Sequence, residues 1–150
     1  MGSVENNVET IKIKYHDPEV IKPVQVEGSD FIDLRSAEDV VMRRGDFRLI
    51  DLSISIELPK GYEMIIVPRS STFKNFGIIQ PNSPACIDES YCGDDDIIKF
   101  PALAMRDTEI HKNDRICQFR IQKHQPKIEF EEVESLGNEA RGGFGSTGIQ

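Results

Sequence analysis

The sequence predicts an all-β fold, and three observations support this. Short stretches of alternating apolar and polar residues recur along the chain, turn signals separate them, and only one segment carries the signals of a helix. Many short strands between turns are typical of a β-sandwich, a jelly roll or a barrel. The chain has 150 residues, an ordinary length for one domain, so we expect a single domain over residues 1–150.

Four segments predict individual strands. Residues 11–15, 52–58 and 116–121 alternate, as strands with one buried face do. Residues 64–67, Met-Ile-Ile-Val, are apolar throughout, which favours a more fully buried strand. Turn residues then predict breaks at 44–46, 59–61, 93–94 and 112–114.

One short helix and a C-terminal arm complete the predicted architecture. The helix is expected to begin near Ser70 or Ser71, either of which could cap it, and to end at Gly77. From about residue 136 to residue 150 the chain is rich in glycine and poor in apolar residues, which indicates a mobile arm.

Charge and cysteine content limit the classes of partner. The formal net charge is −8, which argues against a nucleic acid or an anionic membrane surface as the partner. The three cysteines, Cys86, Cys92 and Cys117, lack the spacing of a disulfide framework, and we interpret them as strand residues. With no leader and no long apolar run in the sequence, we expect a cytoplasmic protein.

Two clusters near the middle of the chain could carry chemistry. Pro68-Arg-Ser-Ser71 follows a strand and opens the helix, so amides, hydroxyls and a guanidinium could converge on a phosphate, although a simple helix cap has the same pattern. Asn82 to Tyr91 places a carboxylate, Asp88, within a predicted strand-turn-strand stretch. Asp88 could orient and deprotonate a water, although an aspartate is also common at a hairpin turn.

Two further clusters lie nearer the C-terminus. In Asn113-Asp-Arg-Ile-Cys-Gln118, Gln118 could donate to an anion, while the Asp-Arg pair at the turn predicts a local ion pair. In Arg141-Gly-Gly-Phe-Gly-Ser-Thr-Gly148, glycines allow amides to approach an anion, and the arginine and hydroxyls suit phosphate. Phe144 could stack on a flat ring.

Read together, the clusters resemble the five motifs of the trimeric dUTPase (dUTP diphosphatase) family. The resemblance covers most of the chain, and five motifs in the right order are specific where each alone is weak. The matching segments are Asp33–Ala37, Pro68–Ser71, Asn82–Gly93, Asp114–Gln118 and Arg141–Gly148.

The resemblance implies a fold and a reaction. The fold is a jelly-roll-like β-barrel subunit with one short helix, assembled as a homotrimer with active sites shared between subunits and closed by the C-terminal arm. The reaction is hydrolysis of dUTP to dUMP and pyrophosphate. Water attacks the α-phosphorus with Asp88 as general base, and Mg²⁺ on the triphosphate is held indirectly, through water, by Asp33.

The resemblance also implies which residues bind the nucleotide. Arg69, Ser70, Ser71 and Gln118 would contact the phosphates, and Arg141, Gly145, Ser146 and Thr147 of the arm would close over them. The segment with Asn82, Ile87 and Tyr91 would select uracil and deoxyribose, and Phe144 would cover the base. Asp30 competes with Asp33 for the role in the first motif.

Two rival functions remain open from the sequence. A dCTP deaminase on a similar fold would need a glutamate at the base, for which Glu89 is the nearby candidate. A nucleotide-sensing regulatory protein would bind dUTP together with a protein partner. The three histidines, His16, His111 and His124, are scattered, and we interpret them as surface or packing residues.

Overall fold

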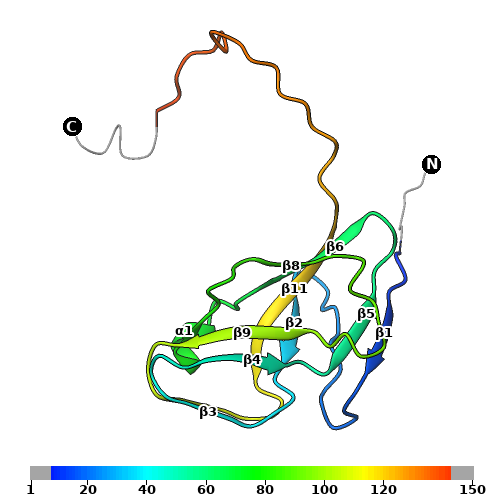
Figure 1. Ribbon diagram of the computed structural model, residues 1–150, viewed down its shortest axis with the longest axis vertical. Coiled ribbons are helices and arrows are strands. Elements are labelled where there is room, and N and C mark those ends of the chain that lie inside the picture. Colours follow the sequence, from blue (N-terminus) through cyan, green and yellow to red (C-terminus); the bar gives the residue numbers. More distant parts are fainter. Residues whose placement is uncertain (1–7, 143–150) are drawn as a thin grey trace.

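The computed structural model describes residues 8–142 and confirms the all-β prediction (Figure 1). Short antiparallel strands and one helix are the regular elements of these residues. The elements are β1 (Lys12–Tyr15), β2 (Ile32–Arg35), β3 (Val40–Met42), β4 (Phe47–Asp51), β5 (Ile54–Glu57), β6 (Tyr62–Val67), α1 (Thr72–Phe76), β7 (Ile78–Ile79), β8 (Ala85–Ile87), β9 (Lys99–Ala104), β10 (Thr108–Ile110) and β11 (Arg115–Lys123).

The strands form four small sheets around one core. The largest has the order β2-β11-β6-β8, the second has the order β4-β9-β7, and the pairs β1-β5 and β10-β3 complete the body. Within residues 8–142 the sheets do not join into one closed hydrogen-bonded barrel, but the arrangement is that of a jelly-roll-like fold.

Side chains of β6 alternate between buried and half-buried positions, whereas in β5 three consecutive residues, Ile54 to Ile56, are buried. In β6, Met64 and Ile66 are fully buried, while Ile65 and Val67 are only half-buried. None of residues 64–67 is exposed, although the second face of β6 is only half-buried. Phe100 of β9 and Ile116 of β11 lie at the centre of the same core.

The helix forms where the sequence predicts it. Gly77 ends α1 in the left-handed conformation, with φ of 63° and its amide donating to the Phe73 carbonyl. Ser71 occupies the N-cap position but makes no capping side-chain hydrogen bond. The hydroxyl of Thr72 instead accepts a hydrogen bond from the Arg69 amide at 2.8 Å, which orders the turn before the helix.

The expected hairpin at Asn82–Tyr91 is wrong as a strand pairing. β8 pairs with β6, and no strand follows it until β9 begins at Lys99. The intervening segment closes through short turns, such as the Tyr91 amide donating to the Asp88 carbonyl at 3.0 Å. Cys92 lies in this segment rather than in a strand, unlike Cys86 and Cys117.

The chain leaves the sheets at the end of β11, earlier than position 136. Residues 124–142 contain no helix or strand and extend away from the body (Figure 1, orange). Four of their apolar side chains are exposed: Ile128, Phe130, Val133 and Leu136.

No helix within residues 8–142 is long and apolar enough to span a membrane.

Candidate active site

Three neighbouring strands bring the first, second and fourth motifs together. Gln118 of β11 pairs with Asp33 of β2 on one side and with Val67 of β6 on the other. Asp33, Gln118 and the turn that follows Val67 therefore lie at one level of the four-stranded sheet. The Gln118 amide group donates to the Pro68 carbonyl at 3.2 Å, which ties the turn to β11.

A buried threonine fixes the turn that carries Arg69. The Thr72 hydroxyl donates to the Ile116 carbonyl at 2.9 Å, and the Thr72 amide donates to the Arg69 carbonyl at 3.0 Å. Thr72 is fully buried, so these bonds are shielded from water. Arg69 and the exposed Ser70 consequently project from a rigid point, as a binding site needs.

Arg69 and Ser70 line a cavity of about 400 Å³ with a cationic wall. Four of the predicted residues line it: Asp33, Arg69, Ser70 and Gln118. Ser71 is not among the lining residues. The sequence analysis gave no role to Lys22 or Arg35, which also line the cavity: Lys22 lies in no motif, whereas Arg35 lies inside the first-motif segment Asp33–Ala37.

Asp33 is the single carboxylate among the lining residues, and arginines hold it. Arg69 Nε lies 2.9 Å from Asp33 Oδ1, and Arg115 Nη1 lies 3.5 Å from Asp33 Oδ2. The predicted local pair of Arg115 with Asp114 is wrong, because the Asp114 carboxylate accepts from the His111 amide. Four cations and one carboxylate give the cavity a net positive charge, despite the acidic chain.

Asp33, not Asp30, occupies the position in the cavity that the first motif predicts. Asp30 does not line this cavity and instead pairs with Arg120 at 3.1 Å.

The residues predicted from the third motif form a second group elsewhere on the sheet. Ile87 ends β8 opposite Met64, and Asp88 follows it on an exposed turn. The Tyr91 hydroxyl donates to the Ile97 carbonyl at 2.9 Å, which positions its ring beside this turn. Asn82 precedes β8, and its carbonyl accepts from Gln80 at 3.1 Å.

The two groups do not meet within one chain. None of Asn82, Ile87, Asp88 and Tyr91 lines the cavity around Arg69. β2 and β8 are opposite edges of the four-stranded sheet, so three strand spacings, about 14 Å, separate them. Asp88 also lies four residues farther along the strand direction than Gln118, which adds about 13 Å.

Most of the fifth motif lies outside the described residues. Arg141 is described and is exposed on the segment that leaves the body. Phe144, Gly145, Ser146 and Thr147 fall beyond residue 142, so their predicted contacts stay predictions.

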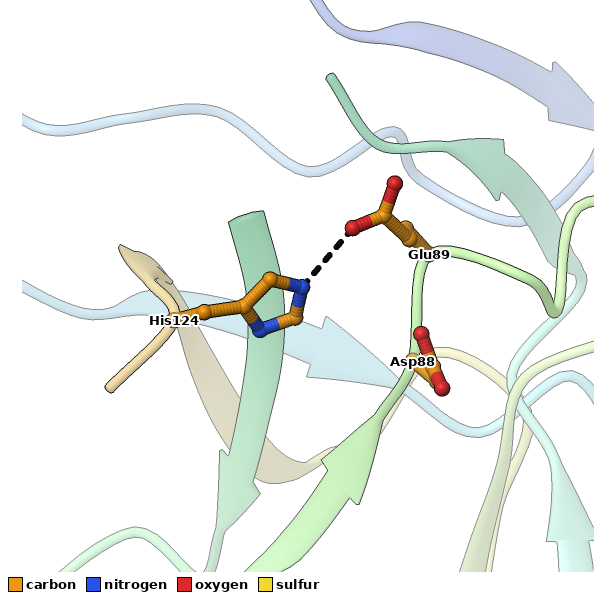
Figure 2. Close-up of side chains that lie close together, drawn as sticks. All are labelled: Asp88, Glu89 and His124. Atoms are coloured by element: carbon orange, nitrogen blue, oxygen red, sulfur yellow. Dashed lines mark hydrogen bonds and ion pairs between the residues drawn. The ribbon is translucent and has the colours of Figure 1, made fainter. Parts of the chain in front are cut away.

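The structure reveals one cluster that the sequence missed. Ligand-type atoms of Asp88, Glu89 and His124 lie within 4.8 Å of one another (Figure 2), which is the one grouping suited to a cation among residues 8–142. Both ring nitrogens of His124 already contact carboxylates, Glu63 at 3.0 Å and Glu89 at 2.8 Å, so we interpret the cluster as an ion-pair network. No local sequence pattern indicates this network, because His124 lies 35 residues from Glu89 and 61 residues from Glu63 along the chain.

Hydrogen bonds in this network shift the pKa values of its members. Hydrogen bonds that the His124 ring donates to Glu63 and then to Glu89 raise the pKa of His124 above its ordinary value. Hydrogen bonds from His124 and the Gly61 amide lower the pKa of Glu89. Gln122 and His124 likewise lower the pKa of Glu63.

Fold and cavity together define a class: an all-β protein with a cationic cavity suited to a polyphosphate, and with a separate exposed carboxylate. Comparison with known proteins identifies the family. The model of the dUTPase family matches residues 19–148. The chain belongs to the dUTPase family.

Curated relatives agree over nearly their whole lengths. The chain is 56% identical over 140 residues to the SPbeta prophage-derived deoxyuridine 5'-triphosphate nucleotidohydrolase YosS of Bacillus subtilis (strain 168), covering 93% of this chain and 99% of that protein. It is 37% identical over 142 residues to the deoxyuridine 5'-triphosphate nucleotidohydrolase of Helicobacter pylori (strain J99), covering 93% and 97%.

Solved structures show the same fold. A variant of the Staphylococcus bacteriophage 80alpha dUTPase with dUpNHpp aligns with a TM-score of 0.72 at 20% identity, covering 95% of this chain and 100% of that one. A dUTPase variant from phage phi11 of S. aureus, described for the coordination of a structural Mg(II) ion, gives 0.71 at 16% identity, covering 85% and 99%.

Proposed function

We propose that this chain hydrolyses dUTP to dUMP and pyrophosphate, as its curated relatives are named for doing. The observation that carries the proposal is the cavity in which Asp33, Arg69, Ser70 and Gln118 converge, because these residues come from three of the five family motifs. A nucleoside triphosphate carries about four negative charges at neutral pH, and a cavity with four cations offsets the repulsion from the acidic chain.

The phosphates bind in this cavity. Arg69 offers the nitrogens that its Asp33 contact leaves free, Ser70 offers a hydroxyl, and the Ser71 region offers backbone amides at the start of the turn. Gln118 donates from β11. Because the Thr72 hydrogen bonds hold the turn rigid, these donors are already oriented before the nucleotide arrives.

Mg²⁺ fits this cavity as a companion of the triphosphate. Asp33 is the only carboxylate among the lining residues and is about one-third exposed, so one acid faces the cavity and water can reach it. Mg²⁺ prefers phosphate oxygens and retains several waters, which matches an indirect role for Asp33. When bound, the ion would neutralise phosphate charge and hold the triphosphate in shape.

The site is completed by a second copy of the chain. Asp88 stands at the opposite edge of the sheet from Asp33, so one chain does not place both on one nucleotide. In a homotrimer with cyclic symmetry, the Asp88 turn of one subunit can face the cavity of its neighbour. The apolar side chains exposed on residues 124–142 also favour a partner surface.

Asp88 supplies the base. Its carboxylate orients a water and accepts its proton as the water oxygen bonds to the α-phosphorus. The bond from that phosphorus to the bridging oxygen of the leaving pyrophosphate breaks in the same displacement. Arg69 and the neighbouring donors stabilise the charge that develops on the phosphoryl oxygens.

Base and sugar selection belongs to the segment between Asn82 and Tyr91. Backbone groups near Asn82 and Ile87 would present a donor to uracil O4, where cytosine instead has an amino group. An unpaired buried donor costs about 1–3 kcal/mol, which is enough to reject cytosine. Tyr91 would pack under the deoxyribose and exclude a 2′-hydroxyl.

The C-terminal arm would close the site. Arg141, Gly145, Ser146 and Thr147 would contact the terminal phosphate, and Phe144 would cover the base. We assign this arm to residues 136–150 of a single 1–150 domain, placed in the cytoplasm.

The rival functions have less support. Glu89, the candidate for a deaminase glutamate, is engaged by the Gly61 amide and His124. The bacteriophage 80alpha dUTPase is described as controlling transfer of virulence genes, but at 17% identity that likeness carries only the fold. We therefore do not propose a regulatory partner for this chain.

A substrate panel tests the function. Purified protein is given dUTP, dCTP, dTTP or UTP with Mg²⁺, and pyrophosphate and ammonia are measured. We expect pyrophosphate from dUTP at least about 100-fold faster than from the other three, and loss of release when EDTA removes the metal. Equal rates for UTP and dUTP would refute the Tyr91 role, ammonia from dCTP would indicate a deaminase, and no release from dUTP would end the enzyme proposal.

A further inference from the structure

His124 joins three parts of the chain at the point where it leaves the sheets. Its backbone amide donates to the Gly61 carbonyl at 2.9 Å, which ends the β11 ladder against the turn before β6. Its Nδ1 lies 3.0 Å from a Glu63 carboxylate oxygen on β6. Its Nε2 lies 2.8 Å from a Glu89 carboxylate oxygen on the turn after β8, as Figure 2 shows.

This geometry requires a protonated ring. An ionised carboxylate only accepts hydrogen bonds, and a neutral imidazole has one N–H donor and one acceptor. Both His124 nitrogens face carboxylates, so only the imidazolium can donate to Glu63 and Glu89 together. Hydrogen bonds to both carboxylates raise the pKa of His124, which favours this form.

The contact bears directly on Asp88 because Glu89 is the next residue. Glu89 Oε1 also accepts from the Gly61 amide at 3.0 Å, so Gly61 and His124 both hold the Glu89 side chain. The Asp88 carboxylate has only a weak local contact among the described residues, the Ser90 amide at 3.3 Å. The position of Asp88 therefore depends on the hydrogen bonds that hold its turn against β6 and the end of β11.

We propose that protonated His124 is a positioning residue that clamps the Asp88 turn through Glu63 and Glu89. The inference rests on the proposed role of Asp88 as the base. Loss of the proton leaves one donor for two carboxylates, so one of the two bonds is lost and the turn loosens. The clamp makes the rate of the chemical step depend on the charge of a residue outside the site.

Several other charged or titratable groups surround the clamp. Asp88 and Cys86 lie on the β8 side, and the Cys86 thiol forms a hydrogen bond with Glu63. Lys60, on the turn before β6, lies near Glu89. Gln122 of β11 donates to Glu63 at 2.8 Å but does not titrate. Among these groups, His124 is the one whose ordinary pKa, 6.5, lies nearest neutrality.

The sign of the pH dependence follows from the direction of the pKa shift. Because the pKa of His124 is raised, the clamp is fully formed below about pH 6.5 and is lost as the pH rises through the raised value. We therefore expect the contribution of His124 to kcat to be largest at low pH and to disappear in alkaline solution.

The experiment compares wild type with His124→Gln and His124→Arg. Glutamine is neutral, as deprotonated histidine is, while arginine keeps its charge and several donors at all working pH values. We measure kcat and KM for dUTP from pH 6 to pH 9, in buffers freed of transition metals and supplied with Mg²⁺. Taking the ratio of wild-type to variant kcat removes the ionisation of the substrate from the comparison.

At pH 6 we expect wild-type kcat to exceed that of His124→Gln by about tenfold, with KM within about twofold, since a small misplacement of a catalytic group lowers rate more than binding. The ratio should approach one in alkaline solution, and His124→Arg should keep the higher kcat there. His111→Gln is the matched control, because His111 also lies near two carboxylates, Asp39 and Glu109, but contacts no part of the turn.

A ratio of one at every pH, or a ratio that never changes with pH, overturns the clamp while leaving dUTP hydrolysis intact. NMR provides a readout that does not need activity. The amide signals of Glu89 and Ser90 should titrate with the His124 ring in wild type and not in His124→Gln. If the chemical shifts of these amides do not change as His124 titrates, the clamp is refuted whether or not the protein hydrolyses dUTP.

Discussion

Replacing Asp88 with asparagine is expected to lower kcat for dUTP by about 10³-fold, which is typical for loss of a general base. Asparagine has nearly the same shape but does not accept the proton of the attacking water. Because Asp88 is exposed and outside the phosphate cavity, the Kd for dUTP should stay within a few-fold of wild type. Pyrophosphate release and equilibrium binding of dUTP measure the two quantities separately.

Asp94→Asn is the matched control for this prediction. Asp94 lies on an exposed turn of the same segment and loses the same charge, yet no part of the proposed mechanism uses it. Its kcat should equal that of wild type. Asp88→Asn protein that retains more than a tenth of the wild-type kcat would show that another group is the base.

Replacing Arg69 with alanine is expected to lower kcat/KM for dUTP by about 10²- to 10³-fold, the usual effect of removing one oriented donor from a site of developing charge. The change removes the guanidinium nearest the Asp33 carboxylate and leaves that acid in the cavity with Arg115 as its remaining partner. Part of the loss should appear in KM, because Arg69 contacts phosphate oxygens in the ground state as well.

Two variants make the Arg69 result interpretable. Arg69→Lys keeps the charge without the planar fork and should fall between alanine and wild type. Arg48→Ala also breaks an arginine-carboxylate pair, the 2.6 Å contact with Glu38, but away from the cavity, and it should leave kcat/KM unchanged. An equal effect of Arg48→Ala and Arg69→Ala would attribute the loss to general destabilisation.

Local chemistry made much of the fold predictable from the sequence. Alternation located the strands around Lys12–Tyr15, Ile54–Glu57 and Arg115–Lys123, and Gly77 marked the helix end. Strands such as Val40–Met42 were missed because three residues are too few to show a period. The pairing of β8 with β6 instead of its sequence neighbour was also hidden, because tertiary pairing depends on contacts that no local pattern records.

The residues of the candidate site could likewise be predicted only in part. Asp33, Arg69 and Gln118 belong to motifs, and the structure brings all three together. Lys22 was missed because it lies in no motif, whereas Arg35 and Arg115 lie inside the first and fourth motif segments, and only the folded sheet shows that both reach the same cavity. His124 was interpreted as a surface or packing residue, since its contacts with Glu63 and Glu89 exist only once β6, β8 and β11 are assembled.

The central claim is that dUTP is hydrolysed at a site built from two chains, with Asp88 from one and the Arg69 cavity from another. Co-expressing Asp88→Asn with Arg69→Ala in equal amounts tests it most directly, because each inactive variant carries the half that the other lacks. Random mixing places two intact halves at about a quarter of the sites, so the mixture should recover about a quarter of the wild-type rate. A mixture of assembled subunits no more active than its two parents would contradict the shared site.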